Sequence, residues 1–179
     1  MSAPFLDKNN GFNIDGFRGN FENAARNYLF YVNIDFPSGI TVEKPNATYL
    51  VRSSKIPAHT IEAKEVPWQG YKYKIGGTST IEDWTVSFTV DAKAGIYKAF
   101  EQWMKKIHNP ATNEHGLPSD YMMDQTVQML NNSGDEVILA MRLFGAWPNS
   151  LGELELTYDG NELATFEVTF SVQRHDTIE

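Results

Sequence analysis

Cysteine is absent from the 179 residues of this sequence. Without thiols, disulfide frameworks, cysteine nucleophiles, Cys-ligated zinc and iron–sulfur clusters are excluded. Apolar runs are short and none approaches the roughly 18 residues of a membrane-spanning helix, so no membrane insertion is expected. Positive charge is also scarce, because 15 Lys and Arg face 23 Asp and Glu, for a formal net charge of −8. This balance argues against a protein that binds nucleic acid through its phosphate backbone, since that binding depends on Lys and Arg.

Residue patterns for catalysis or metal binding are also missing. The four histidines (His59, His108, His115 and His175) are scattered and show no metal-ligand spacing. The acidic pair Glu82-Asp83 lies in a strand-like segment, where adjacent side chains point to opposite faces and do not share acid–base work. No Gly-x-Ser-x-Gly nucleophile motif occurs. The sequence therefore predicts a protein that is not an enzyme and uses no cofactor.

What the sequence does have is aromatic residues, at 13%, and apolar–polar alternation with period two. Such alternation is typical of half-buried strands. The apolar positions fall in four sets: Tyr28, Phe30, Val32, Ile34 and Phe36; Tyr71, Tyr73 and Ile75; Trp84, Val86, Phe88 and Val90; Phe166, Val168, Phe170 and Val172. The second set is expected to end at Gly76-Gly77. Further strands are predicted over residues 49–53 and 60–66. A hairpin is predicted from residues 121–130 and 137–144, joined by a turn at residues 131–135. Residues 137–144 are apolar at nearly every position, which predicts cover on both faces.

One helix is predicted over residues 96–108, because Ile96, Phe100, Trp103, Met104 and Ile107 form a single apolar stripe. Residues 111–120 are interpreted as a polar loop. Strands that do not alternate with helices indicate a mainly β fold, an antiparallel β-sandwich or barrel with one flanking α-helix. We expect residues 28–179 to form this single domain. Residues 1–27, rich in Asn and Gly but with spaced phenylalanines, are expected to form an extended N-terminal arm that docks on its own domain or on a neighbouring subunit.

Residues 66–71 place a tryptophan beside proline and glycine, in the order VPWQGY. We interpret this segment as a projecting hairpin tip whose tryptophan anchors a contact. Sheet edges favour the same assembly role, because they must be closed, covered or paired with another chain. A carbohydrate-binding β-sandwich is the alternative, with Trp68, Tyr71 and Tyr73 as an aromatic stacking platform.

Several collinear motifs between Arg26 and Gln173 resemble the tail tube protein of contractile-tailed, T-even-like bacteriophages. The motifs read RNYLF at residues 26–30, EDWTV at 82–86, GAWPNSLGEL at 145–154 and TFEVT at 165–169, with Phe100 and Trp103 on the helix between them. The arm at residues 1–25 and the ending at residues 174–179 depart from the family pattern.

The resemblance implies a structural virion protein whose hexameric rings stack into the inner tail tube, inside a contractile sheath. The genome would pass through the bore without specific binding. The partners implied are further copies of the chain, the tail sheath protein, and baseplate and tail-terminator proteins. The location implied is the virion tail, assembled in the host bacterial cytoplasm. A baseplate or tube-initiator protein of the same fold, or a tube subunit like those of type VI secretion or bacteriocins, remains an alternative.

By position, residues 66–80 match the family hairpin that engages the next ring. The contact residues this implies are Val66, Pro67, Trp68, Tyr71, Lys72 and Lys74. The residues expected to pack the core of the family motif are Trp84, Phe100, Trp103, Trp147, Phe166 and Val168. Trp147-Pro148 and Gly152 are expected to set a turn before the last strand.

Overall fold

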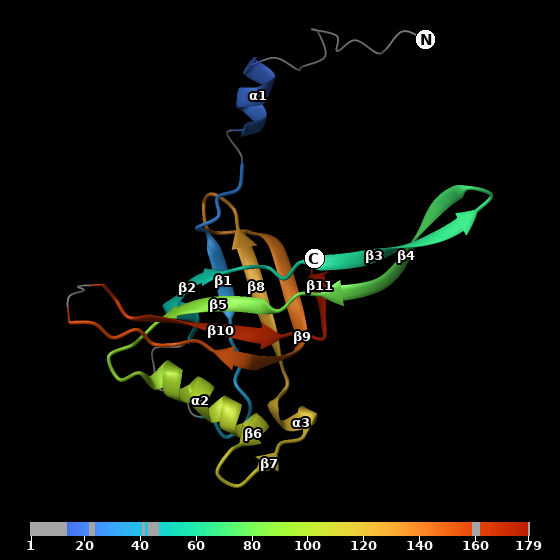
Figure 1. The fold of residues 1–179 in the computed structure, drawn as a ribbon. Coiled ribbons are helices and arrows are strands. Elements are labelled where there is room, and N and C mark those ends of the chain that lie inside the picture. Colours follow the sequence, from blue (N-terminus) through green and yellow to red (C-terminus); the bar gives the residue numbers. More distant parts are fainter. Residues whose placement is uncertain (1–13, 22–23, 41, 43–46, 159–161, 179) are drawn as a thin grey trace.

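The computed structural model describes residues 14–21, 24–40, 42, 47–158 and 162–178. A seven-stranded antiparallel sheet forms the body, in the order β1-β8-β9-β10-β5-β2, with β11 also paired to β9. A separate two-stranded hairpin, β3–β4, projects from this body. Helices α1 and α2 lie at opposite ends of the body (Figure 1).

The body and the hairpin account for most of the strands. Their bounds are β1 Phe30–Asn33, β2 Val51–Ser54, β3 His59–Trp68, β4 Tyr71–Ile81, β5 Trp84–Thr89, β8 Met123–Leu130, β9 Val137–Leu151, β10 Thr165–Ser171 and β11 Arg174–Ile178. The helices are α1 Ile14–Phe21, α2 Gly95–Ile107 and α3 Pro118–Tyr121, with a 3-10 turn at Ala47–Leu50. A small pair of strands, β6 His108–Asn109 and β7 Glu114–His115, follows α2.

The long strand β9 joins the two halves of the sheet. Its first part pairs with β8 and β11, and its last residues pair with β10. Gly145 lies between the two parts with φ +60°, a left-handed conformation that glycine adopts without the steric cost of a Cβ. The sheet therefore folds over onto itself and encloses a core.

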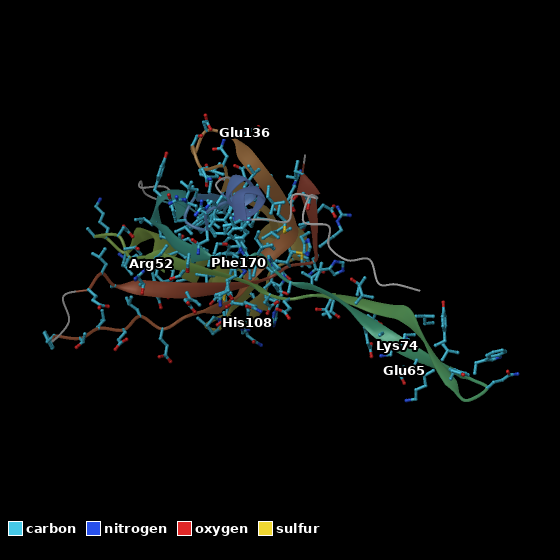
Figure 2. The ribbon with its side chains drawn as sticks, turned by 90° about the horizontal axis from the view of Figure 1, so that it is seen from above. Arg52, Glu65, Lys74, His108, Glu136 and Phe170 are labelled. Carbon is cyan, nitrogen blue, oxygen red and sulfur yellow. The ribbon has the colours of Figure 1, made fainter. Side chains whose placement is uncertain are left out.

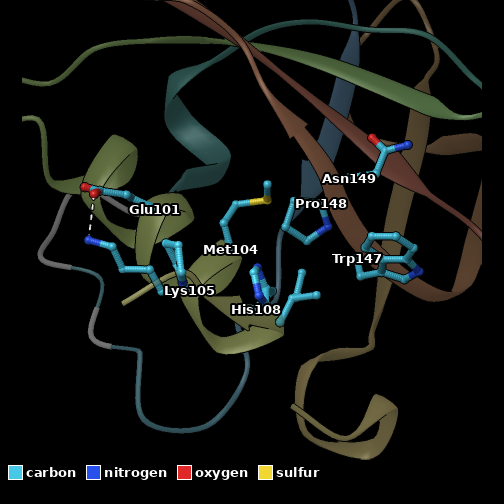
Figure 3. A pocket seen from close by; sticks show the side chains of 9 residues that line it. Glu101, Met104, Lys105, His108, Trp147, Pro148 and Asn149 are labelled. Carbon is cyan, nitrogen blue, oxygen red and sulfur yellow. Dashed lines mark hydrogen bonds and ion pairs between the residues drawn. The ribbon is translucent and has the colours of Figure 1, made fainter. Parts of the chain in front are cut away.

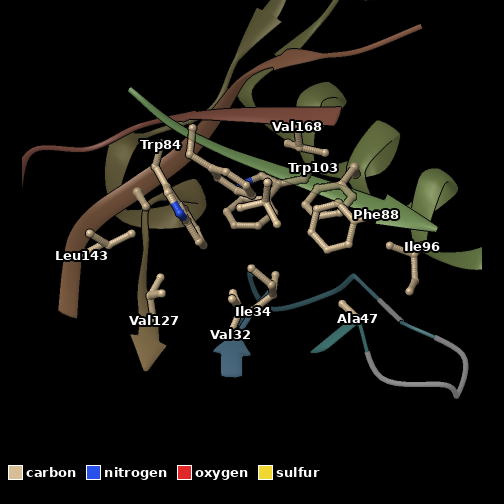
Figure 4. Close-up of a cluster of buried hydrophobic side chains, with 14 of the residues drawn as sticks. Val32, Ile34, Ala47, Trp84, Phe88, Ile96, Trp103, Val127, Leu143 and Val168 are labelled. Carbon is tan, nitrogen blue, oxygen red and sulfur yellow. The ribbon is translucent and has the colours of Figure 1, made fainter. Parts of the chain in front are cut away.

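The core is built from the period-two faces of β5 and β10. Phe166 lies opposite Phe88, and Val168 lies opposite Val86, so each strand places its apolar set on the same side of the sheet. Figure 4 shows these side chains meeting those of β1, β8 and α2. Five of the six predicted core residues are buried: Trp84, Phe100, Trp103, Phe166 and Val168.

Helix α2 closes one side of this core, as its apolar stripe predicts. Phe100 packs at ring-centroid distances of 5.1 Å from both Phe36 and Phe88. The indole Nε1 of Trp103 donates a 2.8 Å hydrogen bond to the carbonyl of Tyr121, which ties α2 to α3. The predicted flanking helix and mainly β, antiparallel fold are confirmed.

Several element boundaries differ from the sequence-based expectations. Strand β4 does not end at Gly76-Gly77, because the backbone pairing with β3 carries it on to Ile81. Trp147-Pro148 does not form a turn, because both residues lie within β9 and pair with β10. The predicted polar loop at residues 111–120 contains β7 and the start of α3.

Two further expectations need correction at the termini. The arm is not extended throughout, because residues 14–21 form α1; residues 1–13 lie outside the described part of the chain. Tyr28 precedes β1 and is exposed, and Ile34 and Phe36 follow its end at Asn33, so only Phe30 and Val32 of that apolar set lie in the strand. Strand β11 was not predicted, since its sequence RHDTI has no alternation of apolar and polar residues.

Candidate assembly site

The β3–β4 hairpin is the most prominent surface feature of the chain. It is a ten-residue strand and an eleven-residue strand that pair only with each other, and it extends well away from the body (Figures 1 and 2). Its tip is a two-residue turn in which Gln69 and Gly70 have φ values of 43° and 84°. Two residues at positive φ are typical of the tight turn whose twist matches paired strands.

The end of this hairpin leaves large aromatic side chains in water. Trp68, Tyr71 and Tyr73 are 67%, 79% and 68% exposed. An isolated two-stranded hairpin is marginally stable at best, and exposed apolar side chains grouped together mark contact sites. The hairpin is therefore a candidate contact surface.

The structure brings together all six predicted contact residues in the distal half of the hairpin. Trp68 lies opposite Tyr71, Pro67 opposite Lys72, and the neighbouring pairs place Val66 and Lys74 within the same half. The ammonium of Lys72 already pairs with Glu65 at 2.8 Å, so it is engaged within the hairpin. A contact of Lys72 with another chain, which the resemblance implies, would have to replace this ion pair.

The base of the hairpin is held to the body by a histidine contact. The His59 ring shares a 2.5 Å hydrogen bond with the hydroxyl of Ser79 on β4. Its ring also packs edge-on against His175 of β11, at a centroid distance of 5.6 Å. These contacts set the direction in which the hairpin leaves the sheet.

The sheet also has unpaired edges. Within the described residues, β1 and β2 each pair with one strand, and β11 pairs with β9 alone. At its start, β9 is apolar but not covered, because Val137 and Ile138 are 44% and 47% exposed. The described residues therefore do not supply the expected cover on both faces at this end of residues 137–144.

The outward face of β8, β9 and β11 carries paired charges. Arg142 binds Asp124 at 2.8 Å, and Arg174 binds Asp176 at 3.2 Å. Phe144 lies between the two arginines, whose guanidinium carbons are 4.9 and 4.3 Å from its ring centroid. These arginines are engaged with carboxylates and an aromatic ring, which leaves them poorly placed to hold phosphate.

A groove lies between α2 and β9, at the far end of the body from α1 (Figures 1 and 3). It has a volume of about 310 Å³, and its lining is Glu101, Met104, Lys105, Ile107, His108, Pro110, Trp147, Pro148 and Asn149. Trp147 contributes to this wall and is half-buried, so it packs less completely than the core position we predicted for it. Its buried Nε1 has no hydrogen-bond partner among the described residues.

The described residues hold neither a cluster of metal ligands nor a helix that could span a membrane. In the described part of the chain, no group of three or more His, Asp or Glu side chains is placed to hold a metal ion. None of its helices is long and apolar enough to cross a membrane. Despite burial, which raises it, the pKa of Asp91 is lowered by hydrogen bonds from backbone N–H groups at the start of α2. One of them comes from Ile96, so the carboxylate helps to hold the N-terminus of this helix.

Comparison with known proteins identifies the family. A family model for phage tail tube proteins matches residues 18–178. The chain belongs to the phage tail tube protein family. It is 30% identical to tail tube protein gp19 of Enterobacteria phage T4, over 83% of this chain and 88% of that protein. It is 27% identical to the tail tube protein of Serratia phage KSP90, over 80% of this chain and 84% of that protein.

This tail tube family member shares its fold with chains of two contractile injection structures. A chain of the cryo-EM structure of the PVC extracellular contractile injection system, sheath/tube terminator in extended state, superposes with a TM-score of 0.63. That match is 19% identical and covers 87% of this chain and 97% of the other. A chain of the anti-feeding prophage baseplate superposes with a TM-score of 0.60 at 12% identity, over 99% and 97%. These likenesses show a common fold.

Proposed function

We propose that this tail tube family member is the subunit of the inner tube of a contractile phage tail. In this role, copies close into hexameric rings and the rings stack into a hollow conduit for the genome. The observation that carries the proposal is the β3–β4 hairpin, with its exposed aromatic tip and the ring contact of His59 with His175 at its base. The relatives named tail tube proteins support it.

Ring closure would use the free edges of the sheet. Strands β1 and β11 flank β8 and β9 and each has an unpaired side. If β1 of one copy pairs with β11 of the next, each edge is satisfied by backbone hydrogen bonds, and the rotation between copies closes a ring. Further copies, the tail sheath protein, and baseplate and tail-terminator proteins are the partners this role requires.

The role is structural and needs no catalysis or cofactor. Genomic DNA would slide through the bore without specific binding, since the paired arginines of the outward sheet face are engaged with Asp124 and Asp176. The location that follows is the virion tail, with assembly in the host bacterial cytoplasm.

A tube-initiator or baseplate role is the second candidate. The baseplate tail-tube junction protein gp54 of Enterobacteria phage T4 is 29% identical to this chain over 124 residues. The match covers 68% of this chain and 38% of that protein, whereas the match to tail tube protein gp19 covers 83% of this chain and 88% of that protein.

Negative-stain electron microscopy of the purified protein tests the proposal. We expect stacked hexameric rings. Isolated rings that never stack would favour the initiator role, and quantitative mass spectrometry of virions would then show few copies per tail. Monomers that bind glycans through Trp68, Tyr71 and Tyr73 would overturn the proposal in favour of carbohydrate binding.

A further inference from the structure

Helix α1 carries an apolar face that none of the described residues covers. Ile14, Phe17 and Phe21 lie at i, i+3 and i+7, so they share one side of the helix, and all three are at least 60% exposed. The rings of Phe17 and Phe21 stack at a centroid distance of 5.3 Å. An isolated helix of eight residues is too short to be stable in water. A docking surface must therefore stabilise α1.

The groove between α2 and β9 has the right size and chemistry for this pair of rings. A cavity of about 150 Å³ lined by apolar side chains accepts one benzene ring. The groove, at about 310 Å³, thus matches two rings. In Figure 3 its floor is formed by Met104, Pro148 and the ring of Trp147, whose nitrogen faces away from the other two.

Except for Nε1 of Trp147, which can only donate, the polar groups on the rim of the groove are already partnered. Lys105 pairs with Glu101 at 2.7 Å, Asn149 donates to Asp83 at 2.7 Å, and His108 hydrogen-bonds Asn113 at 3.3 Å. An occupant with a buried N–H or O–H of its own would leave that group unsatisfied, because Trp and Tyr side chains need a partner when buried. The groove therefore favours two phenylalanines over Trp68 and Tyr71 of the hairpin tip.

The groove of the same chain is out of reach of α1. The carbonyl of Ala24 accepts a 3.2 Å hydrogen bond from Asn132, in the turn that precedes β9, and Leu130 donates to the carbonyl of Leu29 at 2.9 Å. From that end of the body, β9 runs ten residues from Val137 to Trp147, about 33 Å at the rise of a strand. Three residues from Ala24 back to Phe21 span at most about 11 Å.

We infer that α1 of one copy docks into the α2–β9 groove of a second copy, with Phe17 and Phe21 filling it. The inference rests on the proposed tube function. Because helix and groove lie at opposite ends of the body, the contact is head-to-tail, and its repetition joins successive copies of a stack. It adds a second contact between rings to that of the hairpin.

The absence of cysteine makes a direct test available. In the full chain carrying both Phe17→Cys and Met104→Cys, a short bis-maleimide reagent applied to assembled tubes should give a ladder of covalent multimers. Each single variant should give no ladder. Trp68→Cys with Met104→Cys is the matched pair that reports the hairpin in the groove, and it should also give none.

The other outcomes overturn the inference. A ladder from the Trp68→Cys pair alone would place the hairpin in the groove, and a Phe17–Met104 link within one chain would exclude a second copy. Tubes that form without either link would overturn the docking of α1 but leave the tube function standing. A chain that forms no multimers by electron microscopy and no links would overturn both.

Discussion

The side-chain amide of Gln125 hydrogen-bonds both backbone groups of Asp35. The Asp35 N–H donates to Oε1 at 2.8 Å, and Nε2 donates to the Asp35 carbonyl at 2.9 Å. Gln125 is fully buried and belongs to β8, while Asp35 follows β1, ninety residues away in sequence. This reciprocal pair continues the β1–β8 ladder where regular pairing ends at Asn33.

Replacing Gln125 should therefore lower the free energy of unfolding by more than the loss of its side-chain volume alone would. Gln125→Ala removes both partners of the Asp35 backbone groups at a part-buried site and empties the fully buried space of the Gln125 side chain, and we expect a loss of about 2 kcal/mol in the free energy of unfolding. Chemical denaturation measures it. Gln128→Ala, in the same strand but on the outward face, should change it by less than about 0.5 kcal/mol. Equal effects of the two substitutions would contradict a special role for Gln125.

Asp91 should make the stability of α2 depend on pH. Burial raises the pKa of its carboxyl, but hydrogen bonds from the backbone N–H groups of Gly95, Ile96 and Lys93 outweigh this and hold the pKa below its usual value. The native state therefore favours the ionised form. Its contribution is present above the unfolded pKa, near 3.9, and is lost as the pH falls through the lower folded pKa.

For Asp91→Ala we accordingly expect a loss of about 1 kcal/mol at pH 7, the usual cost of losing a side chain that accepts from helix N-terminal N–H groups. The difference from the wild type should shrink as the pH falls below about 4. Asp91→Asn keeps an acceptor without a titrating proton, so its stability difference should be smaller at pH 7. Denaturant titrations at a series of pH values test this, and a constant deficit for Asp91→Ala down to pH 2 would disprove it.

Gly152 is expected to tolerate no side chain. A Cβ there would lie 2.8 Å from the carbonyl oxygen and 3.2 Å from the nitrogen of Glu167, and its own N–H donates to that oxygen at 2.7 Å. We expect Gly152→Ala to lower the free energy of unfolding by about 1–3 kcal/mol, because the backbone of β10 must shift. Gly76→Ala is the matched control, since its Cβ meets only Ile61 at 3.7 Å. Similar melting curves for both variants would refute the close packing at Gly152.

The hairpin tip should matter for assembly and not for folding. Trp68→Ala with Tyr71→Ala removes side chains that are exposed in the single chain, so the free energy of unfolding should change by less than about 0.5 kcal/mol. Stacked rings in electron micrographs should be lost or much shortened, since exposed aromatic anchors carry most of the energy of a contact. Tyr158→Ala, on a loop away from the hairpin, should leave assembly intact. If the double variant forms normal tubes, the hairpin tip does not contribute to the contact between stacked rings.

The sequence is enough to predict the strands with period-two alternation and the amphipathic helix. In the body, side-chain spacing also states which face is buried, as for Trp84, Phe88 and Phe166, whereas the alternating Tyr71, Tyr73 and Ile75 of the hairpin are exposed. It also located the hairpin tip, because proline, glycine and tryptophan together mark a turn with a contact side chain. The family motifs are local strings of residues, so they too were readable without coordinates.

Features that depend on contacts between distant segments become visible only in the folded chain. The continuation of β4 past Gly76-Gly77 and the existence of β11 depend on backbone pairing with β3 and β9, which leaves no pattern in the side chains. Residues far apart in sequence meet in the hydrogen bonds between Gln125 and Asp35. They also meet in the groove that is lined by α2 and Trp147. Local spacing dictates which face of an element is apolar, whereas which distant elements meet depends on how those faces pack together.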